Sequence, residues 1–204
     1  MAKLSEQLAA ILDSGNGERA AHAFLKDHPL IVQNAFARAW NANICVAEFP
    51  LGAEWRADFL LLSADSGHWI ATLIELETPS CRLYLKDGTP SKTLRIAQRQ
   101  LKDWKSWVQE NESYLRQQFA KILRAYGTAA QCSVADSHQK ADTEVLDPRT
   151  VISFDYHIVI GRLSELSAEE QYRRVRERDM WGGPEIATYD RLPHAAKRLD
   201  GPIE

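Results

Sequence analysis

The sequence predicts one α/β or α+β domain built on a mixed central sheet that is flanked by helices. Two short apolar runs, Trp55–Leu62 and Trp69–Leu76, surround a small polar turn, which is typical of a β-hairpin. Helical apolar spacing predicts a long helix from near Ser91 to about Tyr126. A later apolar run, Val151–Ile160, predicts another strand. The long helix therefore crosses between strands of one sheet.

Length and composition restrict the class of protein. A chain of 204 residues suits one domain, and its net charge of −3 means that any contact with nucleic acid needs a local basic surface. The three cysteines show no CxxC spacing, which argues against zinc and disulfides and fits a reducing compartment. The N-terminus has no signal-like apolar segment, and no run approaches membrane-spanning length. We therefore expect a soluble, cytoplasmic protein.

The shorter elements complete the order of the chain. We expect an N-terminal helix within residues 1–16 and a single domain over residues 17–200. Asn111 interrupts the apolar stripe of the long helix, and a bend is expected there. Residues 127–150 are polar and without periodicity, so we expect a flexible loop. The remaining predicted elements are helices at Leu4–Leu12, Glu18–Lys26, Leu30–Trp40, Ser167–Arg178 and Asp190–Leu199, and strands at Asn43–Phe49 and Glu185–Thr188.

Three carboxylates interrupt the apolar sequence of the hairpin. They are Asp58, Glu75 and Glu77. A carboxylate in a buried strand is costly unless it is paired or binds a cation. If the turn is centred between Ser66 and Gly67, Asp58 lies opposite Glu75, and Glu77 lies on the same face as Glu75. Such a cluster of oxygen ligands favours Mg²⁺, or else Mn²⁺.

Simpler interpretations of these acids stay open. The same register places Arg56 opposite Glu77, so a cross-strand ion pair explains part of the cluster equally well. Acidic side chains are also common at exposed strand ends. Glu18 lies in the first turn of a predicted helix, where interaction with the helix dipole explains an acid.

Few other motifs point to chemistry. The sequence contains no HExxH, GxSxG, GxxxxGK[ST] or GxGxxG motif, and its six histidines are scattered. Basic side chains decorate the long predicted helix. Such charges usually form a solvated face, but they are also a candidate surface for nucleic-acid phosphates. The residues that we expect to contact nucleic acid are Arg95, Arg99 and Lys102.

Three segments and their order along the chain carry a family resemblance. The segments Asp58–Leu60, Ile74–Pro79 and Ala97–Leu101, followed by Trp104, resemble the PD-(D/E)XK nuclease superfamily and more narrowly the Shedu antiphage nuclease domain. Shorter matching pieces extend the resemblance over roughly Glu18–Leu199. It implies a restriction-endonuclease-like fold and Mg²⁺-dependent hydrolysis of nucleic-acid phosphodiester bonds, with DNA as the favoured substrate. It also implies a role in antiphage defence and assembly into homo-oligomers.

The resemblance assigns roles to individual residues. Asp58 and Glu75 match the two acids that hold the metal ion, and Gln100 matches a glutamine that supports the site or the DNA. Glu18 matches an acidic position on the first core helix, which makes it a weak candidate for the site. The superfamily places Lys two residues after the second acid, whereas this chain has Glu77.

The departure at Glu77 leaves several interpretations open. Three acids could bind a second cation that takes over the role of the lysine. Arg56, which is predicted opposite Glu77, could supply the missing positive charge. The domain could instead be a catalytically degenerate nuclease fold that acts as a nucleic-acid-binding or protein-assembly module. Hydrolysis of another phosphoester, such as a nucleotide, is a further alternative.

Overall fold

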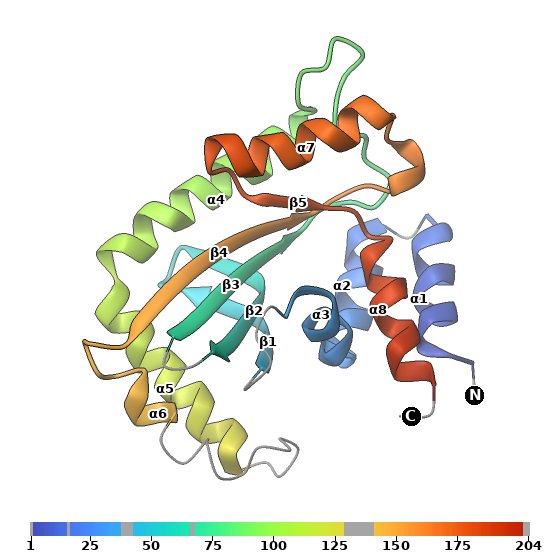
Figure 1. Cartoon of the computed structure of the whole chain (residues 1–204). Coiled ribbons are helices and arrows are strands. Elements are labelled where there is room, and N and C mark those ends of the chain that lie inside the picture. The colour runs from blue at the N-terminus through green and yellow to red at the C-terminus, as the bar shows by residue number, and fades with distance from the viewer. Residues whose placement is uncertain (1, 16, 38–42, 66–67, 129–140, 202–204) are drawn as a thin grey trace.

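The computed structural model describes residues 2–15, 17–37, 43–65, 68–128 and 141–201. Within them the chain forms a five-stranded mixed sheet in the order β1-β2-β3-β4-β5 (Figure 1). The first three strands pair antiparallel, and β3, β4 and β5 pair parallel. The α/β class with a mixed central sheet is therefore confirmed. The strands are β1 (Asn43–Leu51), β2 (Trp55–Asp65), β3 (His68–Leu76), β4 (Val151–Val159) and β5 (Glu185–Ala187).

Helices surround this sheet. The long predicted helix forms two pieces, α4 and α5, because α4 ends at Asn111, whose backbone leaves the helical conformation (φ −122°, ψ 24°). The bend expected at that residue is confirmed. The helices are α1 (Leu4–Asp13), α2 (Gly17–Asp27), α3 (Pro29–Phe36), α4 (Lys92–Glu110), α5 (Glu112–Thr128), α6 (Ala141–Glu144), α7 (Ala168–Trp181) and α8 (Arg191–Asp200), and a short 3₁₀ helix spans Leu163–Glu165.

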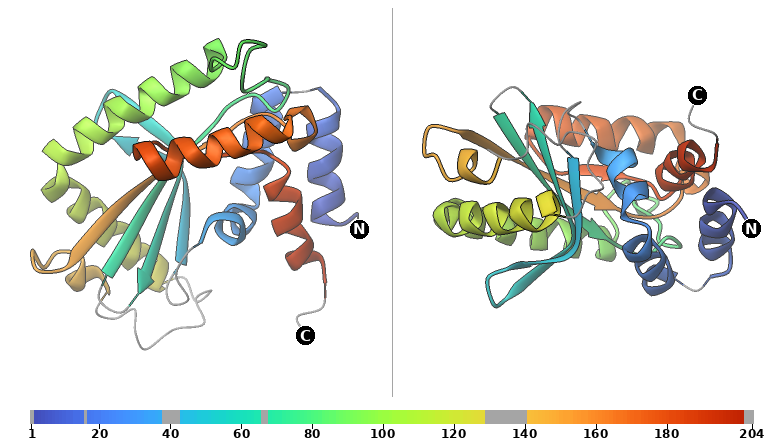
Figure 2. Two further views of the ribbon diagram at one scale, coloured as in Figure 1. Left: turned by 45° about the horizontal axis from the view of Figure 1, so that its top comes forward. Right: turned by 90° about the horizontal axis from the view of Figure 1, so that it is seen from below.

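The sheet carries a hydrophobic layer on each face. Figure 2 shows α4 and α5 on one side of the sheet and α1, α2, α3 and α8 on the other. In β2, Leu60 packs in the layer of α4, whereas Phe59 and Leu61 pack in the layer of the terminal helices. This alternation follows from the two-residue period of a strand. Ala57 packs in the layer of α4 as Leu60 does, so this alternation does not continue unbroken to the start of β2.

The N-terminal helix packs onto the end of the chain. The backbone N–H groups of Leu4 and Ser5 donate to the two carboxylate oxygens of Asp200 at 2.6 and 3.1 Å. A hydrogen bond from the side chain of Ser5, together with these two backbone bonds, lowers the pKa of Asp200. The two terminal helices therefore lie side by side in one layer (Figure 1). No helix in the described part of the chain combines the length and apolar character that crossing a membrane requires.

The prediction of a loop over residues 127–150 is wrong for the two ends of this segment that the structure describes. Helix α5 continues to Thr128, and α6 occupies part of the expected loop. Val145 is fully buried in the same hydrophobic layer as α5. Residues 129–140 lie outside the described part. The error arose because an isolated buried Val in a polar segment produces no periodic signal.

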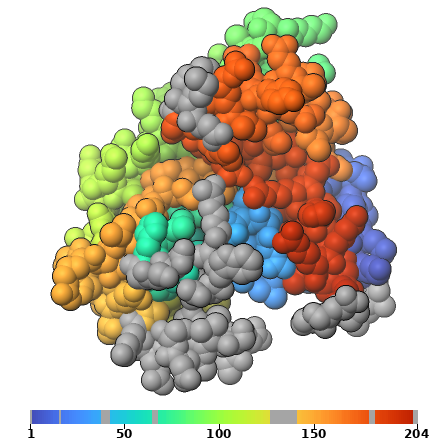
Figure 3. All heavy atoms as spheres, in the orientation of Figure 1, coloured from blue at the N-terminus to red at the C-terminus, as the bar shows by residue number. Residues whose placement is uncertain are grey.

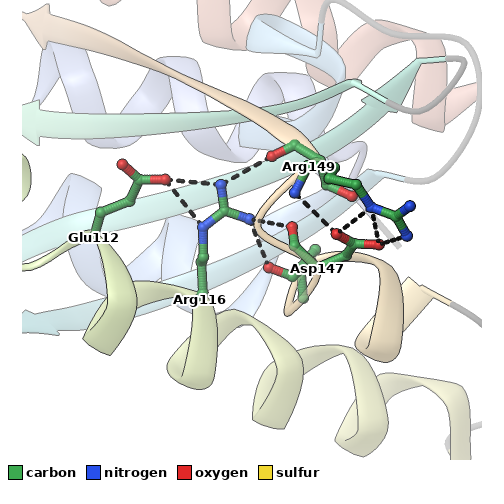
Figure 4. Close-up of polar contacts among 6 residues, drawn as sticks. Glu112, Arg116, Asp147 and Arg149 are labelled. Carbon is green, nitrogen blue, oxygen red and sulfur yellow. Dashed lines mark hydrogen bonds and ion pairs between the residues drawn. The ribbon is translucent and has the colours of Figure 1, made fainter.

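Arg116 of α5 anchors the segment that leads into β4 (Figure 4). Its guanidinium donates to the carbonyl oxygens of Val145 and Asp147 at 3.0 Å and of Thr150 at 2.9 Å. It also pairs with Glu112 at 2.7 Å, and only 12% of its side chain is exposed. Arg116 is therefore a structural residue, although the sequence suggested only a charged helix surface.

Candidate active site

The hairpin has the predicted register. Phe59 pairs with Ile74 and Asp65 with His68, and one further step in this register sets Asp58 opposite Glu75. At that step the regular ladder ends, and a carboxylate oxygen of Asp58 accepts a hydrogen bond from the backbone N–H of Leu76 at 2.7 Å. The two strand ends therefore hold Asp58 in a defined orientation, with its Oδ1 oxygen turned toward α2.

Helix α4 brings Gln100 to the second acid. Gln100 lies three residues after Ala97 and four before Trp104, and both neighbours are completely buried against the sheet. Its side-chain amide donates to Oε1 of Glu75 at 2.7 Å. The structure therefore brings Gln100 and Glu75 together, as the family resemblance implied.

Glu77 lies just beyond the end of β3. Its backbone N–H donates to the carbonyl of Val159 at 2.8 Å, which extends the β3–β4 contact by one residue. Glu77 is half-buried. Its pKa is raised to about 7, first by burial and then by the charges of Glu18 and Asp58. Glu77 is therefore electrostatically part of the same group of acids.

Helix α2 contributes an acid and a histidine. Glu18 is largely exposed, but partial burial of its carboxyl and the charge of Asp58 raise its pKa. His22 lies one helical turn later, with Nε2 3.4 Å from Oδ1 of Asp58, an ion-pair distance without hydrogen-bond alignment. Its ring also contacts Phe59, with centroids 5.6 Å apart. The sequence analysis missed His22, although its i, i+4 spacing from Glu18 was a usable signal.

We name Glu18, Asp58, Glu75 and Glu77 the acidic cluster. Burial is the main cause that raises the pKa of each member. For Glu75 the pKa reaches about 9, with the charge of Asp58 as the second cause and the Gln100 hydrogen bond as a partial offset. The cluster therefore favours bound protons, or a bound cation, over four bare negative charges.

Tyr189 borders the acidic cluster from the segment between β5 and α8. Its side chain is fully buried, and its hydroxyl has no hydrogen-bond partner within the described residues. Burial and the charges of all four cluster members raise its pKa well above the usual value. The sequence analysis gave Tyr189 no role, because a single tyrosine before a helix carries no site signal of its own.

The expected contact between Arg56 and Glu77 does not form. Arg56 lies opposite Pro50 of β1, and its guanidinium is 3.9 Å from the carboxylate of Glu48. Glu48 also pairs with Lys26 and adopts a left-handed backbone conformation (φ 56°), which is costly for a residue with a side chain. Arg56 therefore pairs with an acid of β1, because β2 is flanked by β1 along this stretch.

The predicted nucleic-acid residues Arg95, Arg99 and Lys102 are all exposed on α4. Their spacing of four and three residues places them on one side of the helix. Arg99 directly precedes Gln100, and successive helical residues point about 100° apart. The basic stripe therefore faces away from the side of α4 that carries Gln100.

The donor set of the cluster suits a hard divalent cation, which prefers carboxylate oxygens. Hydrogen bonds occupy one oxygen each of Asp58 and Glu75. The second oxygen of each remains as a candidate ligand. Nevertheless, no group of three or more His, Cys, Asp or Glu side chains within the described ranges is already arranged to hold a metal ion. Glu18 and Glu77 are the other carboxylates of the acidic cluster.

Comparison with known proteins supports the resemblance. A family model described as "Shedu protein SduA, C-terminal" matches residues 15–192. The chain belongs to the Shedu family. No curated protein matches it. The match spans the sheet, α4 and all members of the acidic cluster, and membership in this family suggests a role in antiphage defence.

Proposed function

We propose that this Shedu chain is a Mg²⁺-dependent nuclease that hydrolyses phosphodiester bonds of nucleic acid, most readily DNA, in antiphage defence. The observation that supports this function is the acidic cluster. Asp58 and Glu75 directly follow the last pair of the hairpin ladder, Phe59 and Ile74. Burial raises the pKa of both, and for Glu75 the charge of Asp58 adds to this effect. A chain gains no stability from such an arrangement, so the cluster requires a functional explanation.

Each residue has a distinct role in this proposal. Asp58 and Glu75 hold the metal, which when bound polarises the phosphoryl oxygen and activates a water molecule. The Leu76 N–H and the Gln100 amide orient these two carboxylates. Glu77 is a further ligand or positions the attacking water. The exposed stripe of Arg95, Arg99 and Lys102 attracts the phosphate backbone.

The test combines metal binding with cleavage. Mg²⁺ and Mn²⁺ are titrated calorimetrically into the wild type, Asp58→Asn and the control Asp27→Asn, which changes an exposed acid at the end of α2. Plasmid nicking is followed with the same three proteins. Metal binding and nicking lost only in Asp58→Asn would support the proposal. Nicking by folded Asp58→Asn at the wild-type rate would contradict it.

The presence of a glutamate at position 77 favours one other function. In the superfamily a lysine occupies this position, and the structure places no arginine or lysine in an ion pair with Glu77 among the described residues. A degenerate nuclease fold that binds nucleic acid or assembles with a protein would need no such charge. That function predicts salt-dependent binding of DNA without cleavage under any divalent ion.

A further inference from the structure

A second candidate site lies away from the acidic cluster. A cavity of about 440 Å³ opens where α7, β5 and the start of α8 meet. The segments that line it belong to the orange-to-red surface in Figure 3. Its apolar walls include Leu163 and Val175. The charged side chains that line it are Arg174, Arg178, Arg191, Glu185 and Asp190.

Among these charged side chains, Arg174 has an N–H group without a hydrogen-bond partner in the described residues. One of its terminal nitrogens donates to the carbonyl of Ile186 at 3.2 Å. Its Nε atom is buried and has no hydrogen-bond partner within the described residues. Within the same residues Arg174 also forms no ion pair, and burial lowers its pKa. A half-buried guanidinium without an ion pair is costly, and an anionic ligand in the cavity that it lines would compensate its charge.

Both acids of the cavity wall already form ion pairs. Glu185 pairs with Arg191, and its other oxygen lies 3.5 Å from Arg178. Asp190 accepts from Arg162 at 3.0 Å. Three arginines and two carboxylates, Glu185 and Asp190, line the cavity, so the arginines outnumber the acids of the wall.

We propose that this cavity binds the phosphate group of a small phosphate monoester of about the size of a mononucleotide. Guanidinium groups match phosphate oxygens through paired N–H donors, and the volume lies within the range of small-molecule sites. A monoester carries about −1.5 to −2 charges at pH 7, more than the single charge of a backbone phosphodiester. The apolar side chains Leu163 and Val175 suit the remainder of the ligand.

The cavity and the acidic cluster lie on opposite sides of one short segment. Thr188 and Asp190 line the cavity, whereas Tyr189 between them experiences the charges of the cluster. The phosphate site therefore shares no residue with the cluster. The proposal does not depend on nuclease activity.

The test is calorimetric titration of AMP in buffer without divalent ions. Under these conditions the acidic cluster repels the ligand. Inorganic phosphate, adenosine and an oligothymidylate without terminal phosphates are titrated in parallel. Arg174→Gln removes the unsatisfied guanidinium, and Arg176→Gln is the matched control because it changes an exposed arginine of α7 that does not line the cavity.

We expect AMP and inorganic phosphate to bind the wild type and Arg176→Gln, and adenosine not to bind. Arg174→Gln should weaken AMP binding about tenfold, as loss of one charge-assisted contact does. If this variant is poorly folded, Arg174→Lys keeps the charge without the planar fork, and the same weakening is expected. Glu75→Gln should bind AMP as the wild type does, which separates this site from the proposed active site.

Several outcomes would overturn the proposal. These are absence of AMP binding at millimolar concentration, equal binding of adenosine, or unchanged affinity in a folded Arg174 variant. Competition between the unphosphorylated oligothymidylate and AMP would assign the cavity to backbone phosphates instead, and would also refute a site for a small monoester.

Discussion

The surroundings of Arg116 and the acidic cluster both contain partly buried charges, yet they are built in opposite ways. Arg116 donates to three backbone carbonyls and pairs with Glu112. Beside it, hydrogen bonds from Arg149 lower the pKa of Asp147 to about 2. In the acidic cluster, burial and neighbouring acids instead raise the pKa of Glu75 to about 9.

This contrast separates structural from functional charge. Around Arg116 every strong interaction has its partner within the chain, so the ionised forms stabilise the fold. In the acidic cluster the ionised forms repel one another. Within the described residues two neutral groups, the Leu76 N–H and the Gln100 amide, donate hydrogen bonds to it, and His22 lies 3.4 Å from Asp58. The missing partner must come from outside as protons or as a cation. The following predictions test this difference, from the largest expected effect to the smallest.

Glu75→Gln should separate activity from stability. Loss of a metal ligand should reduce plasmid nicking at least about 100-fold. Without divalent ions, the same change should raise the free energy of unfolding by roughly 1–3 kcal/mol at pH 8. Glu75 is ionised in the unfolded chain at this pH and must take up a proton on folding, whereas Gln is neutral in both states. Nicking assays and urea unfolding measure the two effects. A variant less stable than the wild type would show that the carboxylate has a stabilising partner that we have not recognised.

Arg116→Met should lower the stability of the fold. It removes three hydrogen bonds to partly buried carbonyls, which should lower the free energy of unfolding by about 2–3 kcal/mol. Urea unfolding measures the loss. Glu112→Gln is the control, since it removes only an i, i+4 surface pair and should cost less than about 0.5 kcal/mol. Equal effects of the two variants would contradict the structural role of Arg116.

The stability of the metal-free protein should depend on pH in a specific direction. Because Glu75 and Glu77 have raised pKa values in the folded chain (about 9 and about 7, against 4.5), the folded state retains protons that the unfolded state releases. This contribution is fully present below pH 4.5 and is lost as pH rises toward 9. Thermal unfolding at pH 5 to 9 measures it, and Glu75→Gln should show a smaller decline. An identical decline in both proteins would refute this origin.

Gln100→Ala should have the smallest effect of the set. Loss of the hydrogen bond to Glu75 frees that carboxylate to rotate, so we expect about tenfold weaker Mg²⁺ binding and slower nicking. Gln109→Ala, at the exposed end of the same helix, is the matched control. If the two variants behave alike, Gln100 does not position the acidic cluster.

The local pattern of the sequence determined much of this molecule. Two short apolar runs around one polar turn predicted the hairpin. A turn centred between Ser66 and Gly67 predicted the register that pairs Phe59 with Ile74, one step from Asp58 and Glu75. The apolar stripe of the long helix predicted α4, and its interruption predicted the bend at Asn111. These features follow from periods of two and of about 3.6 residues, which any stretch of sequence displays by itself.

Only the tertiary structure decided which distant side chains meet. His22 reaches Asp58, Tyr189 closes one side of the acidic cluster, and Arg56 pairs with Glu48 instead of Glu77. The period of a helix or strand determines which face of that element a residue occupies. It does not determine where the next element lies in space. That position depends on how the two hydrophobic layers pack against the sheet, which is a property of the whole chain.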